Sequence, residues 1–83
     1  METRVAVISI IVEQSSEKAV DMLNSILHEY SQYIIGRMGL PYAKKNINII
    51  SVVIDAPQDC VSALSGKLGR IEGLSVTSMY SKS

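Results

Sequence analysis

Residues 33–42 read Tyr-Ile-Ile-Gly-Arg-Met-Gly-Leu-Pro-Tyr, and this stretch combines the signals of a strand and of a turn. Its first part, residues 33–38, is rich in the β-branched and aromatic residues that favour strands. Gly39 and Pro41 then predict a turn through residues 39–42, because both residue types are common in turns. Gly36 lies inside the predicted strand, where a glycine is typical of a β-bulge or of a close backbone approach.

Three further stretches have the character of strands. Residues 5–12 read Val-Ala-Val-Ile-Ser-Ile-Ile-Val, and residues 47–54 read Ile-Asn-Ile-Ile-Ser-Val-Val-Ile. A strand with one face in water should alternate apolar and polar residues, whereas these two are largely apolar on both faces. We therefore expect both to lie in the middle of a sheet and to be covered on both sides. Residues 74–80 do alternate and predict a final strand.

Two amphipathic helices are predicted between these strands. Residues 17–31 place seven apolar side chains on one stripe at helical spacing, with Ser15 or Ser16 as the N-terminal cap. The second helix is expected to open at residues 55–57, with Asp55 as its cap and Pro57 in its first turn, and to end before Gly73. Its expected buried stripe consists of Val61, Leu64, Leu68 and Ile71.

The order strand, helix, strand, strand, helix, strand predicts a single α+β domain over residues 1–83. We expect the ferredoxin-like βαββαβ sandwich, with a four-stranded antiparallel sheet and two helices on one face. The side of the sheet without helices would carry an apolar patch large enough to bind a partner. We predict a homodimer or homotetramer joined by Val5, Val7, Ser9, Ile11, Ile47, Ile49, Ser51 and Val53. The serines of this patch either line a pocket between subunits or act as small packing spacers.

The composition excludes several classes of protein. Eight basic and eight acidic residues cancel, so the chain lacks the positive charge of a nucleic-acid-binding protein. Its single cysteine excludes an internal disulfide and is typical of a reducing compartment. The first residues lack the layout of a signal peptide, and no apolar run approaches the ~20 residues that span a bilayer. We therefore expect a soluble cytoplasmic protein that contacts neither membranes nor, directly, nucleic acids.

The single histidine and the single cysteine do not indicate a metal centre. His28 falls on the polar side of the first predicted helix, and a metal site needs several converging ligands, so an exposed histidine is the simpler interpretation. Cys60 falls beside the apolar stripe of the second helix, which indicates a buried, unreactive thiol. We predict no metal and no cofactor. Because no nucleophile–base pair is visible, we also predict that the protein is not an enzyme.

Arg37 is a candidate ligand-binding residue. Alternation along the predicted strand places it on the uncovered side of the sheet and Met38 on the covered side. In one interpretation Arg37, with the backbone at Gly36 and Gly39, holds a small anionic ligand where subunits meet. In the other, Arg37 is an edge-strand cation that prevents aggregation, and the glycines serve a bulge. Both interpretations stay open.

Two more glycines, Gly66 and Gly69, fall on the outward side of the second predicted helix, where each costs about 1 kcal/mol relative to alanine. One explanation is the close approach of a ligand or of another chain, with Lys67 and Arg70 as nearby cations. The other explanation is a loosely wound end of the helix.

Four strings carry a resemblance to a known family. They are the stretch at residues 33–42, Ile-Ser-Val-Val-Ile-Asp-Ala at 50–56, Ser-Ala-Leu-Ser-Gly-Lys-Leu-Gly-Arg at 62–70 and Ser-Val-Thr-Ser-Met-Tyr-Ser-Lys at 75–82. With these strings the chain resembles the iron-only hydrogenase system regulators over nearly its whole length. That family is similar in fold to the ligand-binding domain of the nickel-responsive repressor and to ACT-like regulatory domains.

The resemblance implies a ferredoxin-like subunit that assembles into dimers or tetramers and senses a small ligand. Two departures limit it. The sensing domain of the nickel repressor uses several histidines and a cysteine, whereas residues 35–52 contain neither, so nickel binding is not expected here. The repressor also has a separate ribbon-helix-helix segment for DNA, and 83 residues leave no length for one.

Two functions are therefore expected as alternatives. The first is an oligomeric sensor of the hydrogenase system that binds a small anion near Gly36, Arg37 and Gly39, with Lys67 or Arg70 from the same or a neighbouring chain. The second is an interaction module without a small ligand, which docks on a hydrogenase maturation or metal-cluster assembly protein through the uncovered side of its sheet.

Overall fold

The computed structural model describes residues 2–13 and 16–82. Short 3₁₀ turns at Ser31–Tyr33 and Ala43–Lys45 flank the second strand. No helix in the described part of the chain is long and apolar enough to cross a membrane. The strands and α-helices are β1 (Arg4–Val12), α1 (Glu17–Glu29), β2 (Ile34–Tyr42), β3 (Ile47–Ala56), α2 (Gln58–Gly69) and β4 (Leu74–Tyr80).

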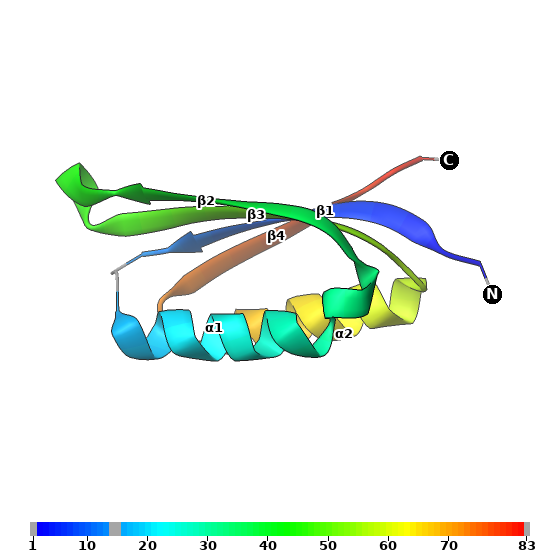
Figure 1. Cartoon of the computed structure of the whole chain (residues 1–83), viewed down its shortest axis with the longest axis horizontal. Coiled ribbons are helices and arrows are strands. Elements are labelled where there is room, and N and C mark those ends of the chain that lie inside the picture. The colour runs from blue at the N-terminus through cyan, green and yellow to red at the C-terminus, as the bar shows by residue number, and fades with distance from the viewer. Residues whose placement is uncertain (1, 14–15, 83) are drawn as a thin grey trace.

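The four strands form one antiparallel sheet in the order β2-β3-β1-β4. β1 and β3 occupy its centre, as their apolar character on both faces predicted. Both α-helices lie on the same side of the sheet, beneath it in Figure 1, and no described α-helix lies on the other side. This is the ferredoxin-like βαββαβ sandwich in two layers, so the predicted fold is confirmed.

The hydrophobic core lies between the sheet and the two helices. Alternate residues of β1 and β3 point into it, and the buried stripes of α1 and α2 close it from the other side. The stripe predicted for α2 is confirmed in full, because all four of its members are buried. The largest side chains that are almost inaccessible to solvent are Ile8, Ile10, Val12, Leu23, Leu27, Val52, Ile54, Val61, Leu64 and Leu68.

α1 begins where the sequence predicted. The Ser16 side chain accepts a hydrogen bond from the backbone N–H of Ala19 at 3.3 Å, which satisfies one of the free donors of the first turn. Ser15, the other candidate cap, lies outside the described residues. The helix ends at Glu29 rather than at residue 31, because residues 31–33 tighten into a 3₁₀ turn that leads into β2.

α2 differs from its prediction at its start. Asp55 does not cap it, because Asp55 still belongs to β3 and pairs with Val5 of β1. Pro57 precedes the helix instead and makes no side-chain capping bond. The helix ends at Gly69, and Gly73 lies in the following turn with φ 90°, a conformation that glycine adopts without steric cost.

The turn predicted at residues 39–42 is wrong, because β2 continues through Tyr42. β2 is an edge strand, so every second N–H group along it points away from β3 and needs no partner in the sheet. Pro41, which has no N–H, is therefore tolerated there. The reversal comes at Ala43–Lys45, and Asn46 closes it with a left-handed φ of 53°.

β2 contains a bulge, as a glycine inside the strand predicted. Ile34 pairs with Ile54 and Gly36 pairs with Val53, so Ile35 is one extra residue that has no partner of its own on β3. Because side chains alternate between the two faces of a strand, one extra residue exchanges the faces of everything that follows it.

We expect truncation of the core to cost far more stability than the same change at the surface. Leu64→Ala removes a side chain that is 0% exposed and should lower the free energy of unfolding by about 2–5 kcal/mol. Met22→Ala, at a residue of α1 that is 44% exposed, should cost clearly less. Urea unfolding followed by circular dichroism measures both values. Equal losses in the two variants would contradict this assignment of the core.

Candidate functional site

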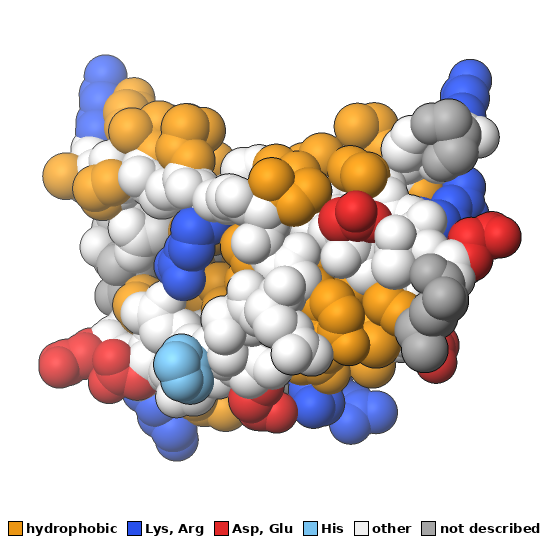
Figure 2. All heavy atoms as spheres, turned by 45° about the vertical axis from the view of Figure 1, so that its right-hand side comes forward, with side chains coloured by type: hydrophobic (Ala, Val, Ile, Leu, Met, Phe, Trp, Pro, Cys, Tyr) orange, Lys and Arg blue, Asp and Glu red, His pale blue; other side chains and the backbone are white. Residues whose placement is uncertain are grey.

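The side of the sheet that faces away from the helices is called the uncovered face below. β2 and β4 extend it with residues that the sequence analysis did not assign to it, among them Met38, Leu40 and Met79. In Figure 2, hydrophobic side chains gather along the upper rim of the molecule, where this side of the sheet lies. The eight predicted interface residues all lie on it: Val5, Val7, Ser9, Ile11, Ile47, Ile49, Ser51 and Val53.

Residues of the uncovered face form rows that cross all four strands. The middle row, called the hydroxyl row, carries small polar side chains on three strands, and an apolar row lies on each side of it. The hydroxyl row is Met38, Ser51, Ser9 and Thr77. The first apolar row is Gly36, Val53, Val7 and Met79, and the second is Leu40, Ile49, Ile11 and Ser75.

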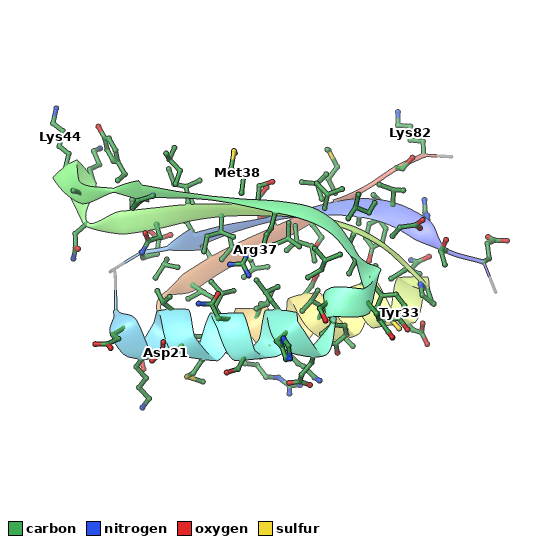
Figure 3. The ribbon with its side chains drawn as sticks, viewed as in Figure 1. Asp21, Tyr33, Arg37, Met38, Lys44 and Lys82 are labelled. Carbon is green, nitrogen blue, oxygen red and sulfur yellow. The ribbon has the colours of Figure 1, made fainter. Side chains whose placement is uncertain are left out.

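Arg37 lies on the side of the sheet opposite to the one that alternation predicted. It pairs with Val52, which is buried beneath the helices, whereas Met38 pairs with Ser51 on the uncovered face. Figure 3 shows Arg37 pointing from β2 toward α1 and Met38 pointing away from the helices. The prediction was wrong because it counted alternate residues straight through Ile35, the extra residue of the bulge.

Arg37 lines a groove between α1 and the edge strand β2. The groove has a volume of about 300 Å³ and is called the Arg37 groove below. Its charged and polar wall comes from both elements and from the 3₁₀ turn that joins them. The lining residues are Asn24, Leu27, His28, Ser31, Ile34 and Arg37.

A hydrogen bond orients the Arg37 side chain within this groove. Its Nη2 donates a hydrogen bond to Oδ1 of Asn24 at 3.1 Å, and both side chains are exposed. No carboxylate is among the lining residues. Sequence reasoning selected Arg37 but missed Asn24, His28 and Ser31. The signal that could have found them is Gly36, since a bulge at this glycine turns Arg37 toward the polar side of α1.

The other predicted ligand-binding cations lie elsewhere. Lys67 forms an ion pair with Glu29 at 3.4 Å, and its ammonium group lies 5.1 Å from the centre of the Tyr30 ring. Arg70 lines a separate cavity of about 590 Å³ near the start of α1, where Glu13 and Glu72 are also present. The structure therefore does not bring Arg37, Lys67 and Arg70 into one site within a single chain.

The four glycines that the sequence analysis considered, Gly36, Gly39, Gly66 and Gly69, lie in open surroundings. A Cβ atom built on any of them would meet no neighbouring atom within 4 Å. Nothing within the described residues packs against Gly66 and Gly69, and α2 keeps its helical form through both. Gly36 and Gly39 lie on the exposed edge of β2, next to the bulge and beyond it.

The described residues contain no group of three or more histidine, cysteine, aspartate or glutamate side chains that could hold a metal ion. His28 is exposed and lines the Arg37 groove. Cys60 is half-buried and packs against the edge of the core.

Comparison with solved structures defines the class of this domain. The ACT domain of GTP pyrophosphokinase from Chlorobium tepidum superposes with a TM-score of 0.74 at 18% identity, over 95% of this chain and 99% of that one. A formyltetrahydrofolate deformylase from Pseudomonas putida KT2440 gives a TM-score of 0.65 at 14% identity, over 90% of this chain and 28% of that one. These likenesses show the fold alone: an ACT-like, ferredoxin-like domain.

The family follows from a closer similarity. The model of the TM1266-like family, described as iron-only hydrogenase system regulator, matches residues 4–78, and the chain belongs to this family. It is similar to uncharacterized protein TM1266 from Thermotoga maritima, with 38% identity, a TM-score of 0.94 and coverage of 98% of this chain and 100% of that one. No curated protein is matched by the sequence.

The Lys67 contacts predict a pH dependence of stability at alkaline pH. Tyr30, and after it Glu29, raise the pKa of the Lys67 ammonium group above its ordinary value of 10.5. A raised pKa in the folded state stabilises the fold below pH 10.5, and this contribution is lost as the pH rises through the folded-state pKa. We expect the urea midpoints of the natural protein and of Lys67→Met to differ below pH 10.5 and to converge as the pH rises above it.

Matched variants test the cause of this effect. Tyr30→Phe removes the phenol hydroxyl and Glu29→Gln removes the carboxylate charge, which are the groups that raise the pKa of the ammonium group, so each change should weaken the pH dependence. The same gap between the natural protein and Lys67→Met across the whole pH range would contradict the assignment.

Proposed function

We propose that this chain is a regulatory, non-catalytic domain of the iron-only hydrogenase system, which works as a homodimer and responds to a small ligand. Family membership supports the regulatory role, and the ACT-like fold supports ligand sensing. The dimer would form through the uncovered face. A ligand that binds one arrangement of the two subunits better than another then shifts the population between them.

One observation carries the dimer. The large apolar side chains that stay exposed lie almost all on one side of the molecule. A small protein rarely leaves such a contiguous apolar surface in water, because burying it against a partner is favourable. Met22 on α1 is the exception. The exposed members on the uncovered face are Val5, Ile35, Met38, Leu40, Tyr42, Ile49 and Met79.

The size of the uncovered face is of the order that a stable dimer needs. Four strands about 4.8 Å apart and about 30 Å long cover roughly 600 Å² in projection, before the relief of the side chains is counted. A standard interface buries about 800 Å² on each partner. Two sheets can pack face to face at about 10 Å, as they do in β-sandwiches.

The rows of the uncovered face fit a second copy of the same chain. The second copy is placed face to face with this chain by a rotation of half a turn about an axis that runs parallel to the hydroxyl row, between the two sheets. Its first apolar row then lies over the second apolar row of this chain. Gly36 then lies opposite Leu40, and Ser75 lies opposite Met79, so that a small residue faces a large one at both edges. The hydroxyl row meets its own copy, where its hydroxyl groups can hydrogen-bond to one another.

The charges at the two ends of the face are compatible with the same arrangement. Lys44 and Lys45 lie at the hairpin between β2 and β3, and Asp55 lies exposed at the opposite end of β3. Half a turn about the hydroxyl row brings each lysine end over the Asp55 end of the second copy. Lys82 lies at that end too, but after β4, two strands away from β3.

We expect the natural protein to have about twice the 9.1 kDa mass of the chain at micromolar concentration, as measured by light scattering during gel filtration. Leu40→Asp should give a folded monomer, because it places a carboxylate in the apolar contact at a residue that is already 54% exposed. Met22→Asp, at an exposed apolar residue outside the face, should leave the dimer intact.

Two outcomes would count against the dimer. A natural protein that stays monomeric at micromolar concentration contradicts it, and so does a dimer that survives Leu40→Asp. If the monomer instead forms a stable complex with a purified hydrogenase maturation protein, and Leu40→Asp abolishes that complex, the face docks a different protein.

A further inference from the structure

We propose that the Arg37 groove binds a small carboxylate anion, with the guanidinium group of Arg37 holding the carboxylate. This inference names the class of ligand for the regulatory role proposed above, and only its regulatory consequence rests on that role. The binding itself uses residues of one chain and does not require the dimer.

The bulge in β2 makes the groove possible. The extra residue Ile35 moves Arg37 from the uncovered face to the side of the helices. β2 is the edge strand next to α1, so Arg37 reaches past the buried core and meets the polar side of α1 (Figures 1 and 3). An exposed arginine thus lines a concave surface.

The hydrogen-bonding capacity of Arg37 exceeds what the chain uses. A guanidinium group has five N–H donors in a fixed planar fork, and one nitrogen bonds to Asn24 at 3.1 Å. Among the described residues, Lys67 and Glu29 form an ion pair, and Arg37 forms none with a carboxylate. The remaining donors can therefore bind an anion.

The charges around the groove favour an anion over a cation. None of its six lining residues is acidic. The nearest acidic residue in sequence on the same side of α1 is Asp21, one turn before Asn24, and it is not among the lining residues. Figure 3 places Asp21 nearer the N-terminal end of α1 than Arg37. An anion in the groove would meet a cation and neutral donors.

The shape of the groove favours a small carboxylate. A carboxylate matches the planar fork of arginine with two parallel hydrogen bonds. The volume of about 300 Å³ is at the lower end of the range of small-molecule sites, which suits a ligand of a few carbon atoms. Ile34 offers apolar atoms for a short carbon chain, while the N–H of His28 and the hydroxyl of Ser31 add donors beside it.

The test is a titration of the natural, ¹⁵N-labelled protein followed by the chemical shifts of its amide groups. Isobutyrate is the probe, isobutylammonium is the matched cation, and inorganic phosphate is the competing oxyanion, all at equal ionic strength. We expect isobutyrate to shift the amides of residues 24–37 in a saturable way at millimolar concentration, and isobutylammonium to leave them unchanged.

Variants identify the residue responsible. Arg37→Gln keeps a hydrogen-bond donor for Asn24 but removes the charge, and should weaken isobutyrate binding about tenfold or more. Arg70→Gln removes an exposed arginine outside the groove and should leave the affinity unchanged. His28→Gln should cause a smaller loss than Arg37→Gln, because it replaces one donor with another.

Three results would overturn the proposal. The first is the absence of a saturable shift up to about 50 mM isobutyrate, a concentration at which even weak sites fill. The second is an unchanged affinity in Arg37→Gln, and the third is tighter binding of phosphate than of isobutyrate. The last result would assign a different anion to the groove.

The same titration on the monomeric variant Leu40→Asp separates this site from the proposed dimer. Binding that persists in Leu40→Asp supports a site built by one chain, whatever the oligomeric state of the natural protein. Binding that disappears in this folded variant contradicts a site within one chain.

Discussion

Two helices can cover only one side of a four-stranded sheet, and most features of this domain follow from that limit. β1 and β3 are apolar on both faces, yet only the face toward α1 and α2 is buried within the chain. A chain of 83 residues buries a small core, so a further apolar surface against a partner would add appreciably to its stability. The uncovered face is therefore the surface through which we propose that this domain assembles.

One extra residue in β2 places Arg37 and the apolar residues of this strand on opposite faces of the sheet, so that the Arg37 groove and the uncovered face are separate surfaces. With Ile35 inserted, Met38, Leu40 and Tyr42 extend the apolar rows of the uncovered face, and Arg37 turns to the helical side. Without it, a charged arginine would lie among the apolar rows, and burying it against a partner would be costly. The bulge thus keeps a cation out of the proposed contact and places it beside α1, where Asn24 orients it.

Much of the fold could be predicted from residue patterns. The stripe of Val61, Leu64 and Leu68 repeats at helical spacing, and such a stripe has one way to be buried. The candidate site could be predicted only in part. Arg37 was selected, but its face was wrong, because alternation is counted along the strand and a bulge is decided by pairing with β3. The end of β2 and the start of α2 were also misplaced, because Pro41 and Asp55 have local preferences that strand pairing overrides.

The sequence by itself determined the class of fold, the central position of β1 and β3, and the apolar character of the uncovered face. These depend on periodicity and composition, which act locally along the chain. The tertiary structure alone decided which side of the sheet Arg37 faces, and that Asn24 and His28 line a groove with it while Lys67 and Arg70 do not. Such groupings join residues distant in sequence, and a shift of one residue in the register of β2 is enough to turn Arg37 to the other face of the sheet.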